Sequence, residues 1–254
     1  MQMGVSMGMN FARGGGGGAA SPYGDLPATD DLLGAWDPAN YAGSGTVYPD
    51  LTGNNDGTIV NSPTYESGVA GGVFDFVAVA GTEAQHVNGL HNTNDIVLDG
   101  TGASISAWVY PSRAPTQWGY AGILMQRSAV ASGLHVSGGT GNWNLTWANQ
   151  HYSMSGPTIL NNVWQLVTCR ITYGDWSNGS NVIKRYAAAS TTDVTITGFY
   201  GGETWNSGNT SIGRDPFGSR YFDGYIGVVA LWNSTVSETD FDDYYTATKS
   251  RYGL

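Results

Sequence analysis

The chain has 254 residues, a length that fits one large β domain or a medium domain with an arm. Only 12% of the residues are charged, whereas glycine (38), tryptophan (9) and tyrosine (15) are abundant, a composition typical of a β-sandwich or barrel and poor for a helical bundle. The net charge of −10 would repel nucleic-acid phosphates and anionic lipid surfaces. We therefore expect neither a nucleic-acid nor a membrane partner.

The single cysteine, Cys169, cannot form a disulfide within the chain, so the sequence is compatible with folding in a reducing cytosol. No apolar run reaches the length of a membrane span. The N-terminus also lacks a basic segment followed by an unbroken apolar stretch. These features predict a soluble chain without an export signal.

Residues 1–30 are expected to form a flexible Met/Gly-rich arm and linker, with five consecutive glycines at Gly14–Gly18 as a hinge. Before the hinge, apolar and small or polar residues alternate with a period of two. This pattern fits either a disordered tail or a strand-like arm that pairs with another chain or inserts in a groove. The proposed anchors of such an arm are Met3, Met7, Met9 and Phe11.

Residues 31–254 show short β-strand signals separated by turn-forming clusters, as in a sandwich. In one of them, 164–173, polar and apolar residues alternate so that Val167 and Cys169 share one face and Leu166 lies on the other. The predicted strands are Leu32–Trp36, Gly57–Val60, Val73–Val79, Ser104–Tyr110, Ala121–Gln126, Gly133–Val136, Trp143–Trp147, Trp164–Tyr173, Asp193–Thr197, Thr210–Gly213 and Gly224–Trp232.

One helix is predicted, at the end of the chain. Ser237 can cap its N-terminus, and Phe241, Tyr244 and Thr248 recur at helical spacing on one face. Gly253 suits the terminating position. We expect this helix to lie across the sandwich.

Five fragments occur in an order that resembles the laminin-G-like domains of the concanavalin A-like lectin/glucanase superfamily. They are "LLGAWDPANYAGSGTVYPDLTGNNDGTIVN", "GGVFDF", "ISAWVYPS", "NVWQLVTCRIT" and "SIGRDPFGSRYFDGYIGVVALWNSTVSETDFDDYY". The resemblance implies an all-β, concanavalin A-like jelly-roll sandwich of two antiparallel sheets, with one short C-terminal helix and an extended N-terminal arm. The sequence departs from the pattern at 76–83, where family members often carry a glycine and paired aspartates.

The opening segment and the ending "TATKSRYGL" are similar to versions found in tailed-phage virion proteins and marine bacterial surface proteins. Together with the arm, the resemblance implies a virion structural protein, either a capsid decoration protein or a tail-associated subunit. Such a protein is made in the host cytoplasm and is extracellular as part of the particle. Its expected partners are other virion proteins, contacted by the arm, and a glycan on the host cell surface or in mucus.

Virion appendages usually follow particle symmetry, so we expect a homo-oligomer, and we expect it to be a trimer. The alternative function is a free bacterial carbohydrate-binding or adhesin module, and a degenerate glycanase is the third reading. The lack of export features favours the virion protein over the free module.

The sequence does not predict an enzyme. Glycosidases need two carboxyl groups, about 5 Å apart in retaining enzymes, but no predicted strand carries a Glu-x-Asp arrangement. The closely spaced carboxylates Glu238, Asp240, Asp242 and Asp243 fall on the predicted helix. The four histidines lack the spacing of a metal site, and no nucleophile motif accompanies them.

Two interpretations remain open for a group of Asp and Asn residues. Asp50, Asn54, Asn55 and Asp56 could supply hard oxygen ligands to calcium, together with Asp75 or Asp223. Alternatively they are turn residues and bind no metal. No other cofactor is expected.

The tryptophans divide into two groups. Trp36, Trp108, Trp164 and Trp232 occur in strands that match family core strands, so we expect them to pack in the interior. Other aromatics stand in or beside loops, next to Asn and Gln, a combination suited to sugar binding because the ring stacks on the sugar while amides bond its hydroxyls; ordinary loop packing or protein contact is the alternative. The predicted carbohydrate-binding residues are Trp118, Trp143, Trp147, Asn149, Gln150, His151, Tyr152 and Trp205.

Overall fold

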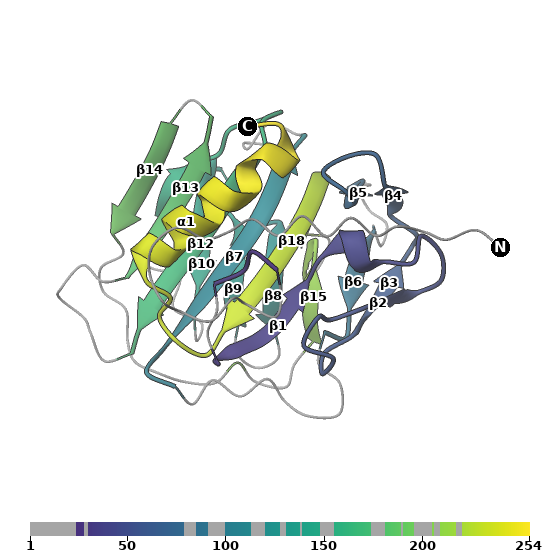
Figure 1. Ribbon diagram of the computed structural model, residues 1–254, viewed down its shortest axis with the longest axis horizontal. Helices are drawn as coiled ribbons and strands as arrows, with labels where there is room; N and C mark the ends of the chain where they lie inside the picture. Colours follow the sequence, from purple (N-terminus) through teal and green to yellow (C-terminus); the bar gives the residue numbers. More distant parts are fainter. Residues whose placement is uncertain are drawn as a thin grey trace.

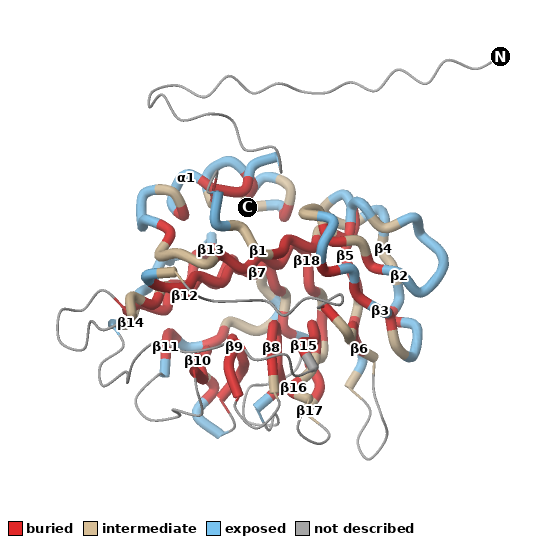
Figure 2. Tube along the Cα trace, turned by 90° about the horizontal axis from the view of Figure 1, so that it is seen from below, coloured by how far each residue is buried: buried red, intermediate tan, exposed pale blue. Residues whose placement is uncertain are grey.

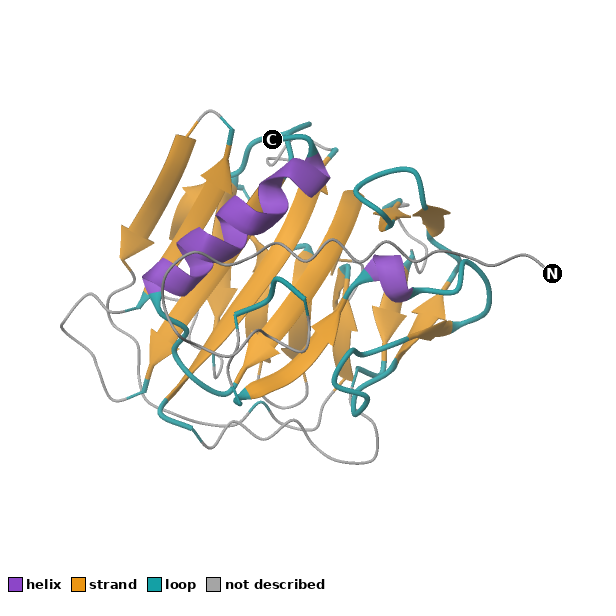
Figure 3. Cartoon of the chain, viewed as in Figure 1, coloured by secondary structure: helices purple, strands orange, loops and turns teal. Residues whose placement is uncertain are grey.

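A computed structural model describes residues 24–27, 30–78, 85–90, 100–112, 120–127, 131–137, 139–147, 155–173, 181–188, 190–195, 205, 209–216 and 220–254. Strands dominate these residues, and the α-helix stands near the C-terminus (Figure 3). Two antiparallel sheets face one another, and the helix covers the outer face of one of them (Figure 2). The predicted β-sandwich with a C-terminal helix is confirmed.

The first sheet lies next to the helix (Figure 1). Its long central strands carry apolar residues on both faces, because both faces are covered. In sheet order its strands are β14 (Ser190–Thr195), β13 (Val182–Ala187), β12 (Gln165–Thr172), β7 (Gly102–Pro111), β18 (Gly224–Trp232), β5 (Val73–Phe76) and β4 (Thr64–Glu66), with β1 (Leu32–Trp36) also paired to β18.

The second sheet forms the other layer, and its pairs are also antiparallel. In order its strands are β11 (Ser155–Thr158), β10 (Asn142–Thr146), β9 (Ala131–Val136), β8 (Gly122–Arg127), β15 (Asn209–Ile212), β6 (His86–Asn88), β3 (Gly57–Val60) and β2 (Val47–Tyr48). A small hairpin of β16 (Arg214–Asp215) and β17 (Arg220–Tyr221) lies beyond β8 (Figure 2).

The main core fills the space between the sheets. The alternation predicted for β12 is confirmed, because Val167 and Cys169 lie in this core whereas Leu166 points to the other side. Aromatic and aliphatic residues of both sheets meet here, and their burial is the main source of stability. Representative members are Trp36, Phe74, Ile105, Leu134, Trp143, Leu145, Trp147, Ile212 and Val229.

A second apolar cluster joins the first sheet to α1 (Glu238–Thr248). The helix begins as predicted, because the Ser237 hydroxyl accepts a hydrogen bond of 3.1 Å from the Asp240 backbone N–H. Trp108 stacks on Tyr252, with 4.1 Å between ring centroids. A 3-10 turn, η3 (Lys249–Tyr252), follows the helix and ends at Gly253, which has a left-handed φ of 74°. The predicted course of the helix across the sandwich is confirmed.

Ion pairs supplement the apolar contact between α1 and β13. The Lys184 ammonium lies 2.7 Å from a carboxylate oxygen of Glu238 and 2.7 Å from one of Asp242. Two of the four closely spaced carboxylates of this helix, Glu238 and Asp242, therefore bind a cation of the first sheet and help to hold the helix on it.

The segment at 24–27 belongs to the predicted arm, but part of it packs on the domain. Leu26 is buried in the cluster that lies under α1. The proposed anchors Met3, Met7, Met9 and Phe11 lie outside the described residues. Among the residues that are described, no helix is long and apolar enough to cross a membrane.

Candidate functional site

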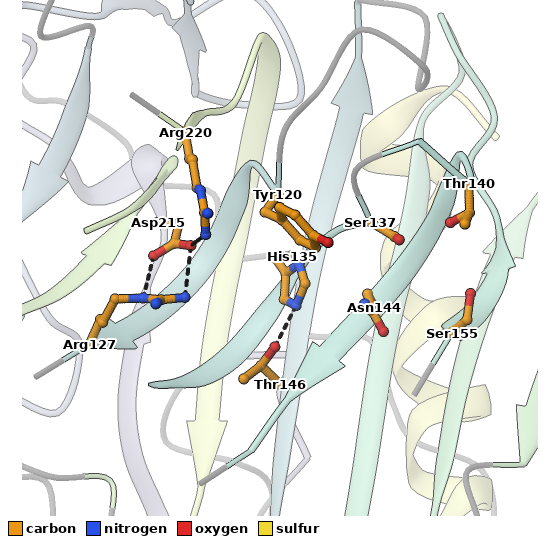
Figure 4. A pocket seen from close by; sticks show the side chains of 10 residues that line it. All are labelled: Tyr120, Arg127, His135, Ser137, Thr140, Asn144, Thr146, Ser155, Asp215 and Arg220. Carbon is orange, nitrogen blue, oxygen red and sulfur yellow. Dashed lines mark hydrogen bonds and ion pairs between the residues drawn. The ribbon is translucent and has the colours of Figure 1, made fainter. Parts of the chain in front are cut away.

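A polar cavity of about 450 Å³ opens on the outer face of the second sheet. It lies over β8, β9 and β10, and the β16–β17 hairpin forms one wall (Figure 4). Its described lining is Tyr120, Arg127, His135, Ser137, Thr140, Asn144, Thr146, Ser155, Asp215 and Arg220.

The alternation of β10 explains why these polar groups face outward. Successive side chains of a strand point to opposite faces of the sheet. Trp143 and Leu145 enter the core, so Asn144 and Thr146 must point to the cavity. The neighbouring strand β9 repeats the pattern, with His135 on the cavity face.

The hairpin sits close to β8 because a glycine lies beneath it. A Cβ atom on Gly122 would collide with the backbone carbonyl of Arg214. The missing side chain therefore lets the hairpin approach the sheet. This approach brings Asp215 and Arg220 to the cavity.

An Arg–Asp–Arg cluster closes the hairpin end of the cavity (Figure 4). The Asp215 side chain is only 2% exposed, and its Oδ1 lies 2.8 Å from Arg127 Nε. Its Oδ2 lies 3.1 Å from Arg127 Nη2 and 2.9 Å from Arg220 Nη1. Two guanidinium groups thus face one carboxylate. The described cavity lining consequently carries one surplus positive charge in a chain whose net charge is −10.

Tyr120 is an exposed aromatic ring at the cavity. It is 43% exposed, and the guanidinium carbon of Arg220 lies 4.9 Å from its ring centroid, within the range of a cation–π contact. Its backbone has a φ of 53°, which is uncommon for a bulky residue and often occurs at functional positions. The ring is therefore held by this contact and is partly accessible.

His135 lies below Tyr120, with 5.8 Å between their ring centroids. Its Nδ1 is 3.0 Å from the Val136 carbonyl oxygen, which can only accept, so Nδ1 carries a proton. Its Nε2 is 2.7 Å from the Thr146 hydroxyl. These two bonds orient the imidazole as part of the cavity floor.

Asn144 provides a buried amide at the other end of the cavity. Asn144 is 8% exposed, and its side-chain Oδ1 is buried without a hydrogen-bond partner. A buried polar atom left in this state costs about 1–3 kcal/mol. This oxygen is covered, so Asn144 contributes to the floor of the cavity.

The predicted aromatic platform is corrected in part by the structure. Trp143, Trp147 and Trp205 are buried in the main core and present no ring face to a sugar. The indole N–H of Trp143 donates to Gln165 Oε1 at 3.0 Å, and that of Trp205 donates to the Thr210 hydroxyl at 3.1 Å. The remaining residues of the platform, Trp118, Asn149, Gln150, His151 and Tyr152, lie outside the described residues.

Asp50, a candidate calcium ligand, organises a loop. Its Oδ1 accepts from the backbone N–H groups of Ala35 at 2.8 Å and Thr52 at 3.1 Å. Its Oδ2 accepts from those of Asn54 at 3.3 Å and Asn55 at 3.0 Å. Both oxygens are therefore already engaged in the turn.

The other candidate ligands also take part in the fold. Asp56 accepts from the backbone N–H of Asp50 at 2.8 Å. On β5, the pKa of Asp75 is raised by burial and by the nearby carboxylates of Asp223 and Glu66, so Asp75 and Asp223 do lie near each other. Across the described part of the chain, no group of three or more His, Cys, Asp or Glu residues could hold a metal ion.

Sequence reasoning missed most of the cavity. Arg127 and Asp215 are separated by 88 residues, and no local pattern connects them. The strand alternation of β10 was the available signal, because it places Asn144 and Thr146 on the face of the sheet that Trp143 and Trp147 do not occupy.

Comparison with known proteins supports the fold assignment. The family described as the concanavalin A-like lectin/glucanases superfamily matches residues 82–240. The chain belongs to this superfamily. A search of curated proteins found no match.

Several solved structures share the sandwich. Domain 4 of AbnA, a GH43 extracellular arabinanase from Geobacillus stearothermophilus, in complex with arabinotriose, has a TM-score of 0.60 and 17% identity, over 84% of this chain and 98% of that one. The Trypanosoma rangeli sialidase has a TM-score of 0.57 and 13% identity, over 90% of this chain. The botulinum neurotoxin serotype D binding domain has a TM-score of 0.55 and 16% identity, over 86% of this chain.

These similarities concern the fold alone, because all three identities are low. The present chain spans only 35% of the sialidase chain and 52% of the neurotoxin binding-domain chain. It therefore corresponds to one lectin-like sandwich domain within those larger proteins.

Proposed function

We propose that this protein is a non-catalytic glycan-binding subunit of a phage particle, which its N-terminal arm attaches to other virion proteins. The observation that carries the binding function is the cavity on the second sheet. It combines a partly exposed ring, Tyr120, with the exposed hydroxyl groups of Thr140 and Ser155. Sugars are bound by this combination, because the ring stacks on their apolar face while polar groups bond their hydroxyls.

The cavity favours binding over hydrolysis. Glycosidases use a pair of carboxyl groups on either side of the scissile bond. The described lining contains one carboxylate, Asp215, and ion pairs with Arg127 and Arg220 occupy both of its oxygens. The described lining therefore lacks the pair of carboxyl groups that such an enzyme uses.

The two sides of the sandwich suit display on a particle. Leu26 packs under α1 on the outer side of the first sheet, and the cavity opens on the outer side of the second sheet. Attachment through the preceding residues would therefore leave the cavity directed away from the particle. Repeated copies, as trimers or on a lattice, would turn weak single sites into strong binding.

A glycan array tests the binding function. The full-length protein, made multivalent on a streptavidin scaffold, is expected to bind a subset of glycans. Tyr120→Ala should lower binding at least tenfold, because it removes the stacking face. The matched control is Val47→Ala, which removes an exposed apolar side chain from β2, at the far edge of the same sheet. Equal binding by both folded variants would contradict the proposed site.

Attachment is tested separately. Deleting residues 1–20 keeps Leu26 and should leave a folded domain that no longer joins its assembly. Mass spectrometry of purified particles should detect the full-length protein but not the truncated one. Normal incorporation of the truncated protein would contradict the role of the arm.

One observation favours a second candidate, a free carbohydrate-binding module. The chain matches 98% of domain 4 of the arabinanase, a domain solved with arabinotriose. A protein absent from particles but active on the array would support this alternative.

A further inference from the structure

We infer that the cavity selects glycans that carry an anionic group, a carboxylate or a sulfate, and that this group binds at the end formed by Arg127 and Arg220. The inference rests on the proposed glycan-binding function and specifies its ligand. It starts from the charge of the cavity. The described lining has two guanidinium groups and one carboxylate, whereas the whole chain has a net charge of −10.

Asp215 fixes the position of both cations, and the described lining holds one carboxylate for these two guanidinium groups. Arg127 contacts both carboxylate oxygens, and Arg220 contacts Oδ2 at 2.9 Å. The arginine side chains remain 19% and 29% exposed, respectively. A guanidinium held in this way loses little conformational freedom when it binds a carboxylate or sulfate, and its planar donor groups match the geometry of such anions.

The order of groups along the cavity predicts the order of groups in the ligand. Figure 4 shows the Arg–Asp–Arg cluster at one end, Asn144 and Ser155 toward the other, and Tyr120 with His135 between them. An acidic sugar at the arginine end would place its ring, or that of the next sugar, beside Tyr120. A hydroxyl farther along would lie near Ser155 and Asn144.

The negative net charge of the chain should confine the binding of anionic groups to the arginine end of the cavity. Polyanions are repelled by the protein as a whole, so an acidic glycan gains its binding energy only where the arginines are reached. The anion contribution should therefore be local and sensitive to salt, because exposed charge pairs are screened at high ionic strength.

The experiment compares glycans that differ only in charge. The array carries lactose, 3′-sialyllactose and its methyl ester, sulfated lactose, and oligogalacturonides with their methyl esters. The full-length protein should bind the acidic member of at least one matched pair at least tenfold more tightly than its neutral counterpart, and this ratio should shrink between 50 mM and 500 mM NaCl. Comparing the carboxylated and sulfated arms identifies which anion is preferred.

Substitutions assign the selectivity to the cavity. Arg220→Gln should reduce the acidic-to-neutral ratio at least fivefold, and Arg220→Lys should restore part of it, because Asp215 keeps its pairing with Arg127 in both. Arg170→Gln is the matched control, since Arg170 pairs with Glu238 on the helix side at 3.4 Å and its replacement should leave the ratio unchanged.

The outcomes separate this inference from the proposed function. Tyr120-dependent binding that is equal for acidic and neutral partners would overturn the anion preference and leave the glycan-binding function standing. Selectivity that survives Arg220→Gln unchanged would also overturn the inference. Absence of binding to every glycan on the array would overturn the proposed function and the inference together.

Discussion

The Asp50 loop provides a direct test of how this sandwich is held together. One buried carboxylate accepts hydrogen bonds from the backbone N–H groups of Ala35, Thr52, Asn54 and Asn55 and from the Thr52 hydroxyl. It thereby joins β1 to the turn that precedes β3. Replacing Asp50 with alanine removes the acceptor and leaves backbone donors without a partner in the interior.

The expected loss follows from the number of bonds. A hydrogen bond to a charged group contributes about 1.5–3 kcal/mol, but bonds to a single group are not additive, and water will reach part of the vacated loop. We therefore expect Asp50→Ala to lower the free energy of unfolding by about 3–5 kcal/mol, less than the sum over these bonds. Asp50→Asn should cost less, about 1–3 kcal/mol, because the amide keeps one acceptor oxygen.

Urea unfolding followed by tryptophan fluorescence measures this loss. Asp193→Ala is the control, because it removes the same charge from an exposed position on β14 and should change stability by less than about 0.5 kcal/mol. A loss below about 1 kcal/mol for Asp50→Ala would refute the reasoning. Calcium that stabilises the natural protein but not Asp50→Ala would refute it as well, since the carboxylate would then be a metal ligand.

Three further predictions concern buried groups. The hydroxyl of Tyr244 is buried without a hydrogen-bond partner, so Tyr244→Phe should raise the free energy of unfolding by about 0.5–1 kcal/mol at pH 7. Burial raises the pKa of this phenol, so the stability of the natural protein should fall as the pH rises above about 10. Urea unfolding at several pH values should show a smaller fall for the variant. Burial raises the pKa of the Cys169 thiol, so a thiol reagent should label it only after unfolding, and rapid labelling of the native protein would contradict its position. Gly122→Ala should displace the β16–β17 hairpin and abolish glycan-array binding while circular dichroism still shows the sandwich.

Much of the fold could be predicted because strand alternation and capping are local. The bounds Leu32–Trp36, Gly57–Val60 and Gly224–Trp232 are confirmed residue by residue, and the Ser237 cap is confirmed by its hydrogen bond. The strand Val182–Ala187 was missed. It carries two adjacent cations in its middle, and their burial depends on partners that are distant in sequence.

The site was predicted less well, for a physical reason. Residues in one strand share a face when they are two apart, so Trp143 and Trp147 belong with the apolar Leu145, and all three are buried. The tryptophans were predicted to be exposed because loops lie next to them, but strand alternation places them on the buried face. The cation cluster was beyond sequence reasoning, because packing a hairpin against Gly122 creates it.

The exposed end of the first sheet determines how copies of this chain would meet edge to edge. Strand β14 borders the sheet, and five of its six residues are exposed. An unprotected sheet edge invites another copy to add its own strand, and such pairing can propagate into insoluble aggregates. Here the edge is short and rich in serine and threonine, and Asp193 would oppose its own copy if two edges paired antiparallel about that residue. Pairing between two copies of this edge is therefore disfavoured, which would keep neighbouring sandwiches from joining into one continuous sheet.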